Sequence, residues 1–409
     1  MSDLTDTPAT ETPTETPATE TPTETPATDA ATDAVLSPLH AEHLALGATM
    51  VPFAGWTMPL RYTSDLAEHQ AVRTAAGLFD LSHMGELHVD GPGAGAGLDL
   101  ALVGNISGLA VGRARYTMIV QPDGGVLDDL IVYRLGEEQY LVVANASNVA
   151  VVRDALAERL ADADASLTDR SLETALIAVQ GPRAVEIVTG LTDPAHVEAV
   201  RDVKYYAGLP ATVGGVEALV ARTGYTGEDG YELFVPADAA PGLWRDLLAA
   251  GAPLGLVPAG LSARDSLRLE AGMPLYGNEL DTTTAPHDAG LGRVVRLDKV
   301  DADGAPLPFV GREALAARAH ATPSRVLVGL VGSGRRAARH GYEVVASTEP
   351  DAATVGRVTS GAPSPTLGTP IAMAYVTPEV SAVGTELAVD VRGRREPVRV
   401  VALPFYRRA

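Results

Sequence analysis

The chain has 409 residues, of which 46% are hydrophobic, and a formal net charge of −21. This length predicts two or three domains, and the acidity argues against nucleic acid and anionic membrane surfaces as partners. The sequence contains no cysteine, which excludes disulfides, thiolate metal sites, iron–sulfur clusters and cysteine nucleophiles. No secretory signal and no run of about 18 apolar residues is visible, so we expect a soluble, cytoplasmic protein.

Residues 1–36 repeat Thr-Glu-Thr-Pro-Ala and Thr-Glu-Thr-Pro-Thr, with no large apolar residue between Leu4 and Val35. This composition buries too little surface to offset the entropy of ordering, so we predict a disordered tail. Residues 1–34 hold eight acids and no Lys or Arg, which leaves a net charge of −13 on the rest. We expect a solvated extension without catalytic function, and a docking tail is the alternative.

Residues 37–318 have the pattern of an α+β region that contains two lobes, whose segments could be interleaved. A helical pattern over 39–46 comes first, and Asn148 is predicted to cap a helix over 149–160. A later helix is expected to open at Gly181-Pro182, because proline suits a first helical turn. The predicted strands and the remaining helix cover 86–89, 116–120, 126–135, 140–144, 175–179, 217–222, 231–235 and, for the helix, 259–270.

After about residue 320 the pattern changes to short alternating strands separated by Gly, Pro and Ser, which is typical of a small sandwich or barrel. We therefore predict an all-β domain over residues 319–409. Its expected strands cover 325–330, 342–346, 356–358, 371–375, 386–391 and 398–402.

Two adjacent acids, Asp128 and Asp129, lie inside the apolar strand predicted over 126–135. Because successive strand residues point to opposite faces, one acid lies with Leu130 on one face and the other with Ile131 on the opposite face. An unpaired carboxylate in such surroundings costs several kcal/mol. At least one of the two acids therefore needs a partner, and a ligand is a good candidate.

Several familiar motifs are absent from the sequence. The glycine-rich run 91–97 follows a strand, but its spacing does not fit G-x-G-x-x-G. His40, Glu42 and His43 do not have the spacing of a zinc helix, so we expect them on a solvated helix face. No G-x-x-x-x-G-K-[ST] and no G-x-S-x-G occurs, which leaves phosphoryl transfer and serine hydrolysis without support.

Two further clusters have both a structural and a functional interpretation. Arg264 and Arg268 are spaced i and i+4 on one predicted helix, as in an ion-pair ladder on a helix surface. Glu228, Asp229 and Glu232 lie in or beside the glycine-rich loop 224–230, as exposed hairpin acids also would. The glycines of this loop indicate a tight backbone that a side chain would disturb.

Seven motifs, together and in this order, resemble the T-protein family of the glycine cleavage system, which are tetrahydrofolate-dependent aminomethyltransferases. The resemblance covers about residues 37–408. Residues 335–339 depart from it, because members of the family often have a proline after an arginine in this stretch and this chain has none. The motifs are Val51-Pro52-Phe53-Ala54-Gly55-Trp56, Leu81-Ser82-His83-Met84-Gly85-Glu86, Asp128-Asp129, Gly224-Tyr225-Thr226-Gly227-Glu228-Asp229-Gly230, Ala263-Arg264-Asp265-Ser266-Leu267-Arg268-Leu269-Glu270-Ala271-Gly272, Thr359-Ser360-Gly361-Ala362-Pro363-Ser364-Pro365 and Pro404-Phe405-Tyr406-Arg407.

The resemblance implies a three-lobed folate-binding fold with a C-terminal β-barrel, and it assigns roles to particular residues. Asp129 matches the catalytic aspartate, with Asp128 as the alternative, and Glu232 matches the glutamate that binds the pterin ring. Arg264 matches a substrate-contacting arginine that either meets folate or braces Glu232. Four further residues match positions that line the folate pocket: Met84, Tyr116, Asn145 and Tyr225. Arg407 also matches, but it lies at the end of the chain, which varies within the family.

The implied reaction moves the aminomethyl carbon from the lipoyl arm of an H-protein to tetrahydrofolate and releases ammonia. Tetrahydrofolate is thus the expected co-substrate and lipoylated H-protein the expected partner, with no metal, flavin or pyridoxal phosphate. A folate-dependent demethylase is one alternative, but the chain has no flavin domain. A non-catalytic folate-binding or iron–sulfur maintenance relative is another. Such proteins typically carry a cysteine in the loop 224–228 and lack the acid pair, unlike this chain.

Overall fold

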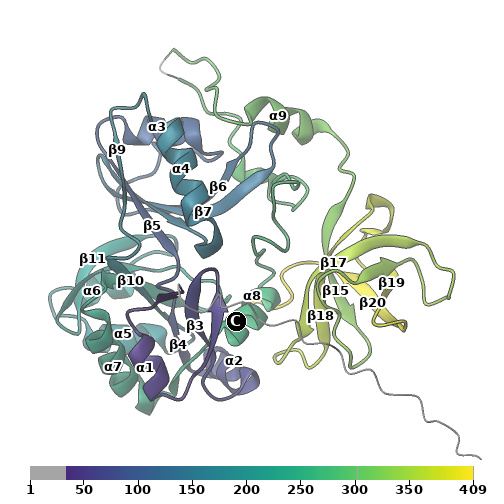
Figure 1. Cartoon of the computed structure of the whole chain (residues 1–409), viewed down its shortest axis with the longest axis horizontal. Helices are drawn as coiled ribbons and strands as arrows, with labels where there is room; N and C mark the ends of the chain where they lie inside the picture. The colour runs from purple at the N-terminus through teal and green to yellow at the C-terminus, as the bar shows by residue number, and fades with distance from the viewer. Residues whose placement is uncertain (1–33, 302, 409) are drawn as a thin grey trace, which may run out of the picture. The chain divides into compact units, whose positions relative to one another are not determined.

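The computed structural model describes residues 34–301 and 303–408. They form a three-stranded sheet, a six-stranded sheet, a five-stranded sheet and a closed six-stranded barrel (Figure 1). The predicted α+β class with a C-terminal β-barrel is confirmed. Among the described residues, helices long and apolar enough to cross a membrane are absent.

The disordered tail was predicted over residues 1–36. Residues 1–33 lie outside the described residues, but the limit at residue 36 needs correction. Val35 and Leu36 form strand β1 and pair in parallel with Trp56 and Thr57. The folded part therefore includes these two residues, because their backbone completes the small sheet β1-β3-β2. Its other strands are β2 (Thr49–Phe53) and β3 (Trp56–Arg61).

The five-stranded sheet has the order β6-β7-β8-β5-β9 and is antiparallel throughout. Two helices pack on one of its faces, where Leu98, Val152 and Leu156 join the apolar residues of the strands. The strands alternate between two buried faces, so the opposite face is also covered. The elements are β5 (Gly85–Asp90), α3 (Ala94–Ala101), β6 (Ala114–Val120), β7 (Val126–Gly136), β8 (Gln139–Ala144), α4 (Val149–Arg159) and β9 (Ser166–Asp169).

The six-stranded sheet has the order β11-β12-β13-β10-β4-β14. Strand β4 precedes the whole five-stranded sheet and its neighbour β10 follows it, so the chain leaves this sheet and later returns. Helices pack on this sheet, and the large apolar core between them includes Trp244. The elements are α1 (His40–Ala45), α2 (Asp65–Thr74), β4 (Ala76–Asp80), β10 (Thr174–Gln180), α5 (Ala184–Leu191), α6 (Val197–Asp202), β11 (Gly208–Val213), β12 (Val216–Ala221), β13 (Gly230–Pro236), α7 (Ala240–Gly251), β14 (Leu256–Pro258) and α8 (Leu261–Glu270).

The barrel closes in the order β15-β18-β17-β16-β19-β20 around a core of small and branched side chains. Helix α9 (Arg312–His320) precedes it, so the predicted domain limit between residues 318 and 319 falls inside a helix. The strands are β15 (Val326–Gly332), β16 (Glu343–Val345), β17 (Thr354–Pro363), β18 (Pro370–Val376), β19 (Glu386–Asp390) and β20 (Arg395–Val401). Four single-turn helices complete the described elements: η1 (Ala146–Asn148), η2 (Ala252–Leu254), η3 (Gly292–Val294) and η4 (Pro378–Val380).

A buried carboxylate at the end of α8 joins the six-stranded lobe to the barrel. Glu270 accepts hydrogen bonds from the Ser364 hydroxyl at 2.5 Å and the Thr366 N–H at 3.0 Å. Its other oxygen pairs with Arg73 of α2 at 2.9 Å. Burial opposes ionisation, but the hydrogen bonds, led by that of His69, lower the pKa of Glu270 to about 2. The charged carboxylate therefore holds α2, α8 and the barrel together.

Two local predictions were wrong. Helix α5 begins at Ala184 rather than at Gly181-Pro182, because Gly181 has φ +134° and its N–H bonds to Asp229 of the neighbouring loop. The face expected to be solvated on α1 carries His43, which is fully buried. Its ring bonds to Asp80 at 2.8 Å and to the Tyr62 hydroxyl at 2.9 Å. The sequence of this short helix, His-Ala-Glu-His-Leu-Ala, did not reveal these contacts, because Asp80 and Tyr62 are distant in the sequence.

The segment after α8 packs directly on the turn that leads into β7. A methyl group on Gly125 would overlap the backbone oxygen of Thr282, an approach that no side chain tolerates. The Val126 N–H also bonds to the Asp281 oxygen at 3.1 Å. Close backbone approach at Gly125 therefore seats this segment beside the strand that carries the acid pair.

We expect Gly125→Ala to destabilise the protein by about 1–3 kcal/mol, because the added methyl must push two backbones apart. Gly190→Ala is the control, since this residue is helical and an added methyl there would have no atom within 4 Å. Thermal unfolding of both variants checks this. Equal midpoints for the two would contradict the packing described for Gly125.

Candidate functional site

The acid pair of β7 divides between the two faces of the five-stranded sheet, as the strand alternation predicted. Asp128 is fully buried on the face that packs against α4. Asp129 is partly exposed and lies on the opposite face, beside Ile131 and Tyr133. The two carboxylates therefore have different surroundings, although they are neighbours in the sequence.

Two asparagines satisfy the carboxylate of Asp128. The Asn145 backbone N–H donates to Oδ2 at 2.9 Å, and the Asn145 side-chain amide donates to Oδ1 at 2.9 Å. Asn148 donates its side-chain amide to Oδ1 at 2.8 Å. Asn148 was predicted to cap α4, but its side chain makes no capping bond to the helix. It bonds to the acid instead.

Asp129 has one protein donor on each oxygen. The Tyr116 hydroxyl donates to Oδ2 at 2.9 Å, and the Asn145 side-chain amide donates to Oδ1 at 2.9 Å. A carboxylate has about four lone-pair sites, so each oxygen can accept a further hydrogen bond. Asp129, Tyr116 and Asn145, all predicted site residues, are thus in direct contact and retain capacity for a ligand.

Burial dominates the electrostatics of the pair. It raises the pKa of Asp128, as does the charge of Asp129, while hydrogen bonds from Asn145 and Asn148 oppose this. Burial also raises the pKa of Asp129, against the hydrogen bond from Tyr116. Burial and the nearby Asp129 charge raise the pKa of the Tyr116 hydroxyl, so this group donates and stays neutral. The pair can therefore hold and release a proton close to neutral pH.

A second group consists of Tyr225 and Arg264, which approach the acid pair from the other lobe. The guanidinium carbon of Arg264 lies 4.8 Å from the centroid of the Tyr225 ring. The Tyr225 hydroxyl donates to the backbone oxygen of Pro274, which fixes the ring. Burial raises the pKa of Tyr225, and the charge of Asp129 contributes to this. Tyr225 therefore lies near Asp129, and Arg264 lies against the ring of Tyr225.

Glu232 lies on β13, close to this group, and is 8% exposed. Its Oε2 accepts the Thr223 hydroxyl at 2.5 Å. Burial raises its pKa, while the charge of Arg264 lowers it. Arg264 does not form an ion pair with it or a hydrogen bond with any described side chain. The guanidinium donors of this partly buried arginine are therefore not taken by the described side chains. Glu232 is not one of the exposed hairpin acids considered from the sequence.

The last two predicted residues differ in placement. Met84 directly precedes β5 and Asn145 directly follows β8, and the pairing of Gly85 with Ala144 brings them to one edge. Met84 packs with the apolar residues around Tyr133. Arg407, in contrast, is exposed and makes no hydrogen bond or ion pair with the described residues. Its participation stays a prediction.

Sequence reasoning missed the contributions of Asn148 and His83. His83 is 3% exposed, and burial together with the charge of Arg264 lowers its pKa to about 4, so the imidazole is neutral. Its Nδ1 has no partner among the described residues. The sequence held one indication for Asn148. It lies three residues after Asn145, which directly follows β8, the strand that pairs with the acid-bearing strand β7.

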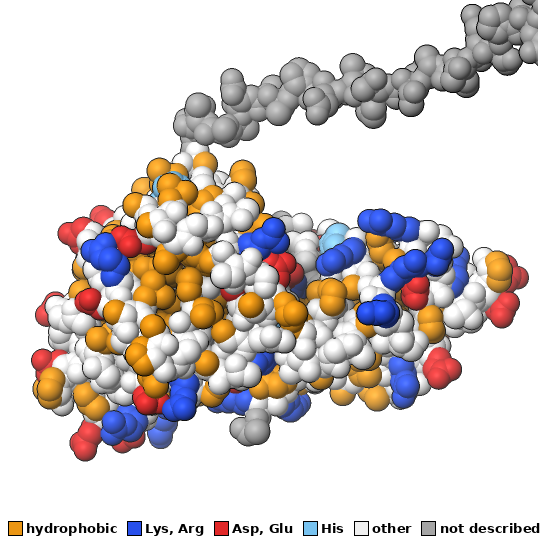
Figure 2. All heavy atoms as spheres, turned by 90° about the horizontal axis from the view of Figure 1, so that it is seen from below, with side chains coloured by type: hydrophobic (Ala, Val, Ile, Leu, Met, Phe, Trp, Pro, Cys, Tyr) orange, Lys and Arg blue, Asp and Glu red, His pale blue; other side chains and the backbone are white. Residues whose placement is uncertain are grey.

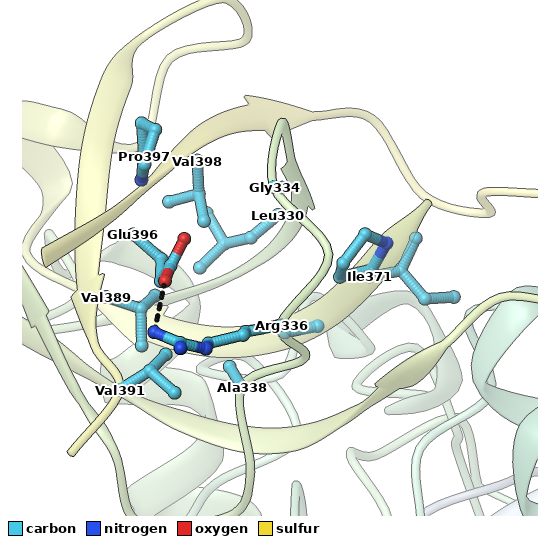
Figure 3. A pocket seen from close by; sticks show the side chains of 13 residues that line it. Leu330, Gly334, Arg336, Ala338, Ile371, Val389, Val391, Glu396, Pro397 and Val398 are labelled. Atoms are coloured by element: carbon cyan, nitrogen blue, oxygen red, sulfur yellow. Dashed lines mark hydrogen bonds and ion pairs between the residues drawn. The ribbon is translucent and has the colours of Figure 1, made fainter. Parts of the chain in front are cut away.

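The hollows of the surface do not all coincide with these residues. One, with about 320 Å³ of space partly open to solvent, lies in the barrel and is lined mainly by apolar residues (Figure 3). Arg336 and Glu396 pair across it at 3.3 Å. None of the predicted site residues lines it. A smaller hollow of about 180 Å³ is lined by Arg264, Asp80 and Leu81 and adjoins the site.

Basic side chains gather over the barrel on the face shown in Figure 2. The exposed arginines of the barrel lie on two turns, at residues 335–339 and 392–394, and on strands β17 and β20, as Arg357 and Arg399. These arginines form a separate feature from the acid pair.

Asp129, Tyr116 and Asn145 supply a carboxylate, a neutral tyrosine and an amide. Such a set can orient an amine and accept its proton, while Glu232 and Arg264 can bind a heterocyclic amide edge and an anion.

The chain is similar to known proteins along almost its whole length. Residues 39–299 match the GCVT N-terminal domain, and residues 325–407 match the glycine cleavage T-protein C-terminal barrel domain. An aminomethyltransferase of Streptomyces coelicolor is 61% identical over 381 residues, covering 92% of this chain and 99% of the relative. An aminomethyltransferase of Geobacillus kaustophilus is 44% identical over 373 residues, covering 91% and 99%. The crystal structure of glycine cleavage system aminomethyltransferase T from Bartonella henselae has a TM-score of 0.81 and 34% identity, covering 91% and 98%.

We expect Tyr116→Phe to raise the pKa of Asp129 further, because the ionised carboxylate loses a donor worth about 1.5–3 kcal/mol. A carbon-13 NMR titration of the aspartate carboxyls measures this. Tyr342→Phe, which changes a tyrosine in the barrel, is the control. An Asp129 titration that is the same in all three proteins would show that the Tyr116 hydrogen bond is not made.

Proposed function

The chain belongs to the glycine cleavage T-protein family and is an aminomethyltransferase, and from this we propose its full reaction. It transfers the aminomethyl carbon from the lipoyl arm of an H-protein to tetrahydrofolate, releasing ammonia and leaving the dihydrolipoyl arm. The proposed products are ammonia and 5,10-methylenetetrahydrofolate. We place this reaction in the cytoplasm.

The acid pair is the observation that carries this proposal. Asp129 has lone pairs left on both oxygens, a fixed orientation from Tyr116 and Asn145, and a raised pKa. Such a carboxylate can orient a folate amine and accept its proton as the nitrogen attacks the methylene carbon. Asp128 is not accessible to an amine, because it is fully buried, where it accepts three hydrogen bonds from Asn145 and Asn148. We therefore assign the base to Asp129.

The residues around Glu232 suit a pterin ring and a folate tail. A pterin presents an amino group and a ring N–H side by side, and the second oxygen of Glu232 is free of the Thr223 bond. Arg264 is held over Tyr225 and has unused guanidinium donors, which suit a carboxylate. This arrangement favours direct contact between Arg264 and folate over bracing of Glu232. Met84 and Asn145 would border the same space.

The chemistry that tetrahydrofolate supplies is a pair of nucleophilic nitrogens that capture one carbon. The chain itself then needs to bind and orient the folate and to accept a proton from it. One carboxylate with unused lone pairs, that of Asp129, is enough for this. A sequence without cysteine fits this role, because the thiol belongs to the lipoyl arm of the partner. Among the described residues, no group of three potential metal ligands is found.

Single-turnover ammonia release from aminomethyl-loaded H-protein tests the proposal. We expect release to depend on tetrahydrofolate and to yield one methylenetetrahydrofolate for each ammonia. Mock-loaded H-protein, which carries no aminomethyl group, is the control. Folate binding without movement of the carbon would contradict the proposed reaction and leave a folate-binding protein.

We expect Asp129→Asn to retain tetrahydrofolate binding and to lower kcat by about 10²–10⁴, the usual contribution of a general base. Burial raises the pKa of Asp129 to about 6. In the wild type, kcat should therefore fall as the pH drops through about 6, because the base becomes protonated, and the variant should lack this limb.

The matched control is Asp288→Asn, which removes a buried carboxylate that pairs with Arg318 at 3.2 Å and accepts the Ala285 N–H at 3.0 Å. It should leave kcat nearly unchanged. Turnover of Asp129→Asn within about threefold of the wild type would refute the assignment of the base, since general-base assistance is worth far more.

A further inference from the structure

Asp128 is bound in a way that serves structure and not proton transfer. It is fully buried, and both of its oxygens accept hydrogen bonds from Asn145 or Asn148. A substrate amine cannot reach it, because no part of the residue is exposed. Yet an ionisable group in this position is costly, and an apolar residue would suit the core better. The acid therefore needs a reason to be there.

Asn148 is oriented by its acceptors. Its side-chain nitrogen lies 2.8 Å from Oδ1 of Asp128 and 3.3 Å from the backbone oxygen of Leu127. Both partners accept hydrogen bonds, so the nitrogen and not the oxygen of the amide must face β7. The residue is 8% exposed and lies immediately before α4. Packing of this helix on the sheet thus holds the amide against the acid.

Asn145 lies between the two acids. Its side-chain nitrogen is 2.9 Å from Oδ1 of Asp128, 2.9 Å from Oδ1 of Asp129 and 3.1 Å from the Asp129 backbone oxygen. An amide nitrogen has only two hydrogens for these three acceptors. The orientation of the amide therefore depends on both carboxylates at once, and a displacement of Asp128 alters the contact with Asp129.

We propose that Asn148, Asp128 and Asn145 form a hydrogen-bond relay that positions Asp129, with Asn148 and Asp128 acting only through Asn145. The relay deepens the proposed function, because it assumes that Asp129 is the base. Asp128 fixes the Asn145 backbone and side chain together, and Asn148 fixes Asp128. Asp128 is thus a positioning residue, and so is Asn148, which no motif of the sequence singled out as part of the site.

The relay also has an electrostatic consequence. Burial and the charge of Asp129 raise the pKa of Asp128, and the Asn148 hydrogen bond lowers it. Loss of that bond makes Asp128 hold its proton to higher pH. A protonated Asp128 donates where it now accepts, and it competes with the Asn145 amide for the oxygens of the pair.

Asn148→Ala tests the relay, because it removes the donor and leaves every group on the Asp129 face in place. We expect kcat to fall about tenfold, the effect of losing one charge-assisted hydrogen bond. The KM for tetrahydrofolate should stay within about twofold, since the proposed folate contacts of Glu232 and Arg264 are untouched. Ser147→Ala is the control, because this exposed neighbour touches only the far oxygen of the Asn148 amide, at 3.5 Å, and makes no hydrogen bond to Asp128, Asn145 or Asp129.

A double-mutant cycle separates positioning from general destabilisation. If Asn148 acts through Asp129, adding Asn148→Ala to Asp129→Asn should cause no further loss of kcat. Additive losses, or an unchanged kcat in Asn148→Ala, would overturn the relay. Asn148→Ser, which keeps a hydroxyl donor in a smaller side chain, should retain more activity than Asn148→Ala and replaces it in the cycle if the alanine variant does not fold.

A measurement without substrate distinguishes failure of the relay from failure of the proposed function. In a carbon-13 NMR titration, Asn148→Ala should raise the higher of the two apparent pKa values of the acid pair, while Ser147→Ala should not. An unchanged titration overturns the relay even if the enzyme transfers carbon. A raised value in a protein that transfers no carbon supports the relay and refutes the reaction.

Discussion

The site depends on one polar contact, the bifurcated amide of Asn145 between two neighbouring carboxylates. Strand geometry sends Asp128 and Asp129 to opposite faces of a sheet. A single side chain at the end of the adjacent strand reaches both, because β7 and β8 are paired and Asn145 directly follows β8. Without that amide, two like charges would lie side by side in a mostly apolar interior, at a cost of several kcal/mol.

The second requirement is that two lobes and the barrel keep a fixed relation around helix α8. The C-terminal end of α8 is tied to the barrel by Glu270, while Arg268 donates to Ser360 of β17 at 2.8 Å. The same helix carries Arg264, which lies against the Tyr225 ring. Under the proposed function, the barrel supplies none of the acids but fixes the helix that carries this cation.

The sequence predicted most of the strands because their alternation is regular, as in β7, where Asp128, Leu130 and Val132 are buried on one face. It predicted less where tertiary contacts override local pattern. His43 carries no local sign that Asp80 will bind it, since the two are 37 residues apart. Asn148 is a common helix-capping residue type, so its bond to Asp128 could not be separated from a cap without the strand pairing. The family resemblance named Asp129, Asn145 and Tyr116 together, but only the structure shows that Asp129 is partly exposed with one donor on each oxygen, while Asp128 is fully buried with three.

The sequence could not distinguish the two arginines of α8, but their contacts in the structure do. Arg268 is 1% exposed and its donors are taken by Asp265, Glu279 and Ser360. Arg264, one helical turn earlier, has a ring beneath it and no hydrogen-bonding partner among the described residues. The spacing of i and i+4 places both arginines on one face of the helix, and it does not tell which of them is available to a ligand. Arg264 is partly buried and its guanidinium donors are not taken by the described residues, so it and not Arg268 is the arginine that the proposed function assigns to an anion.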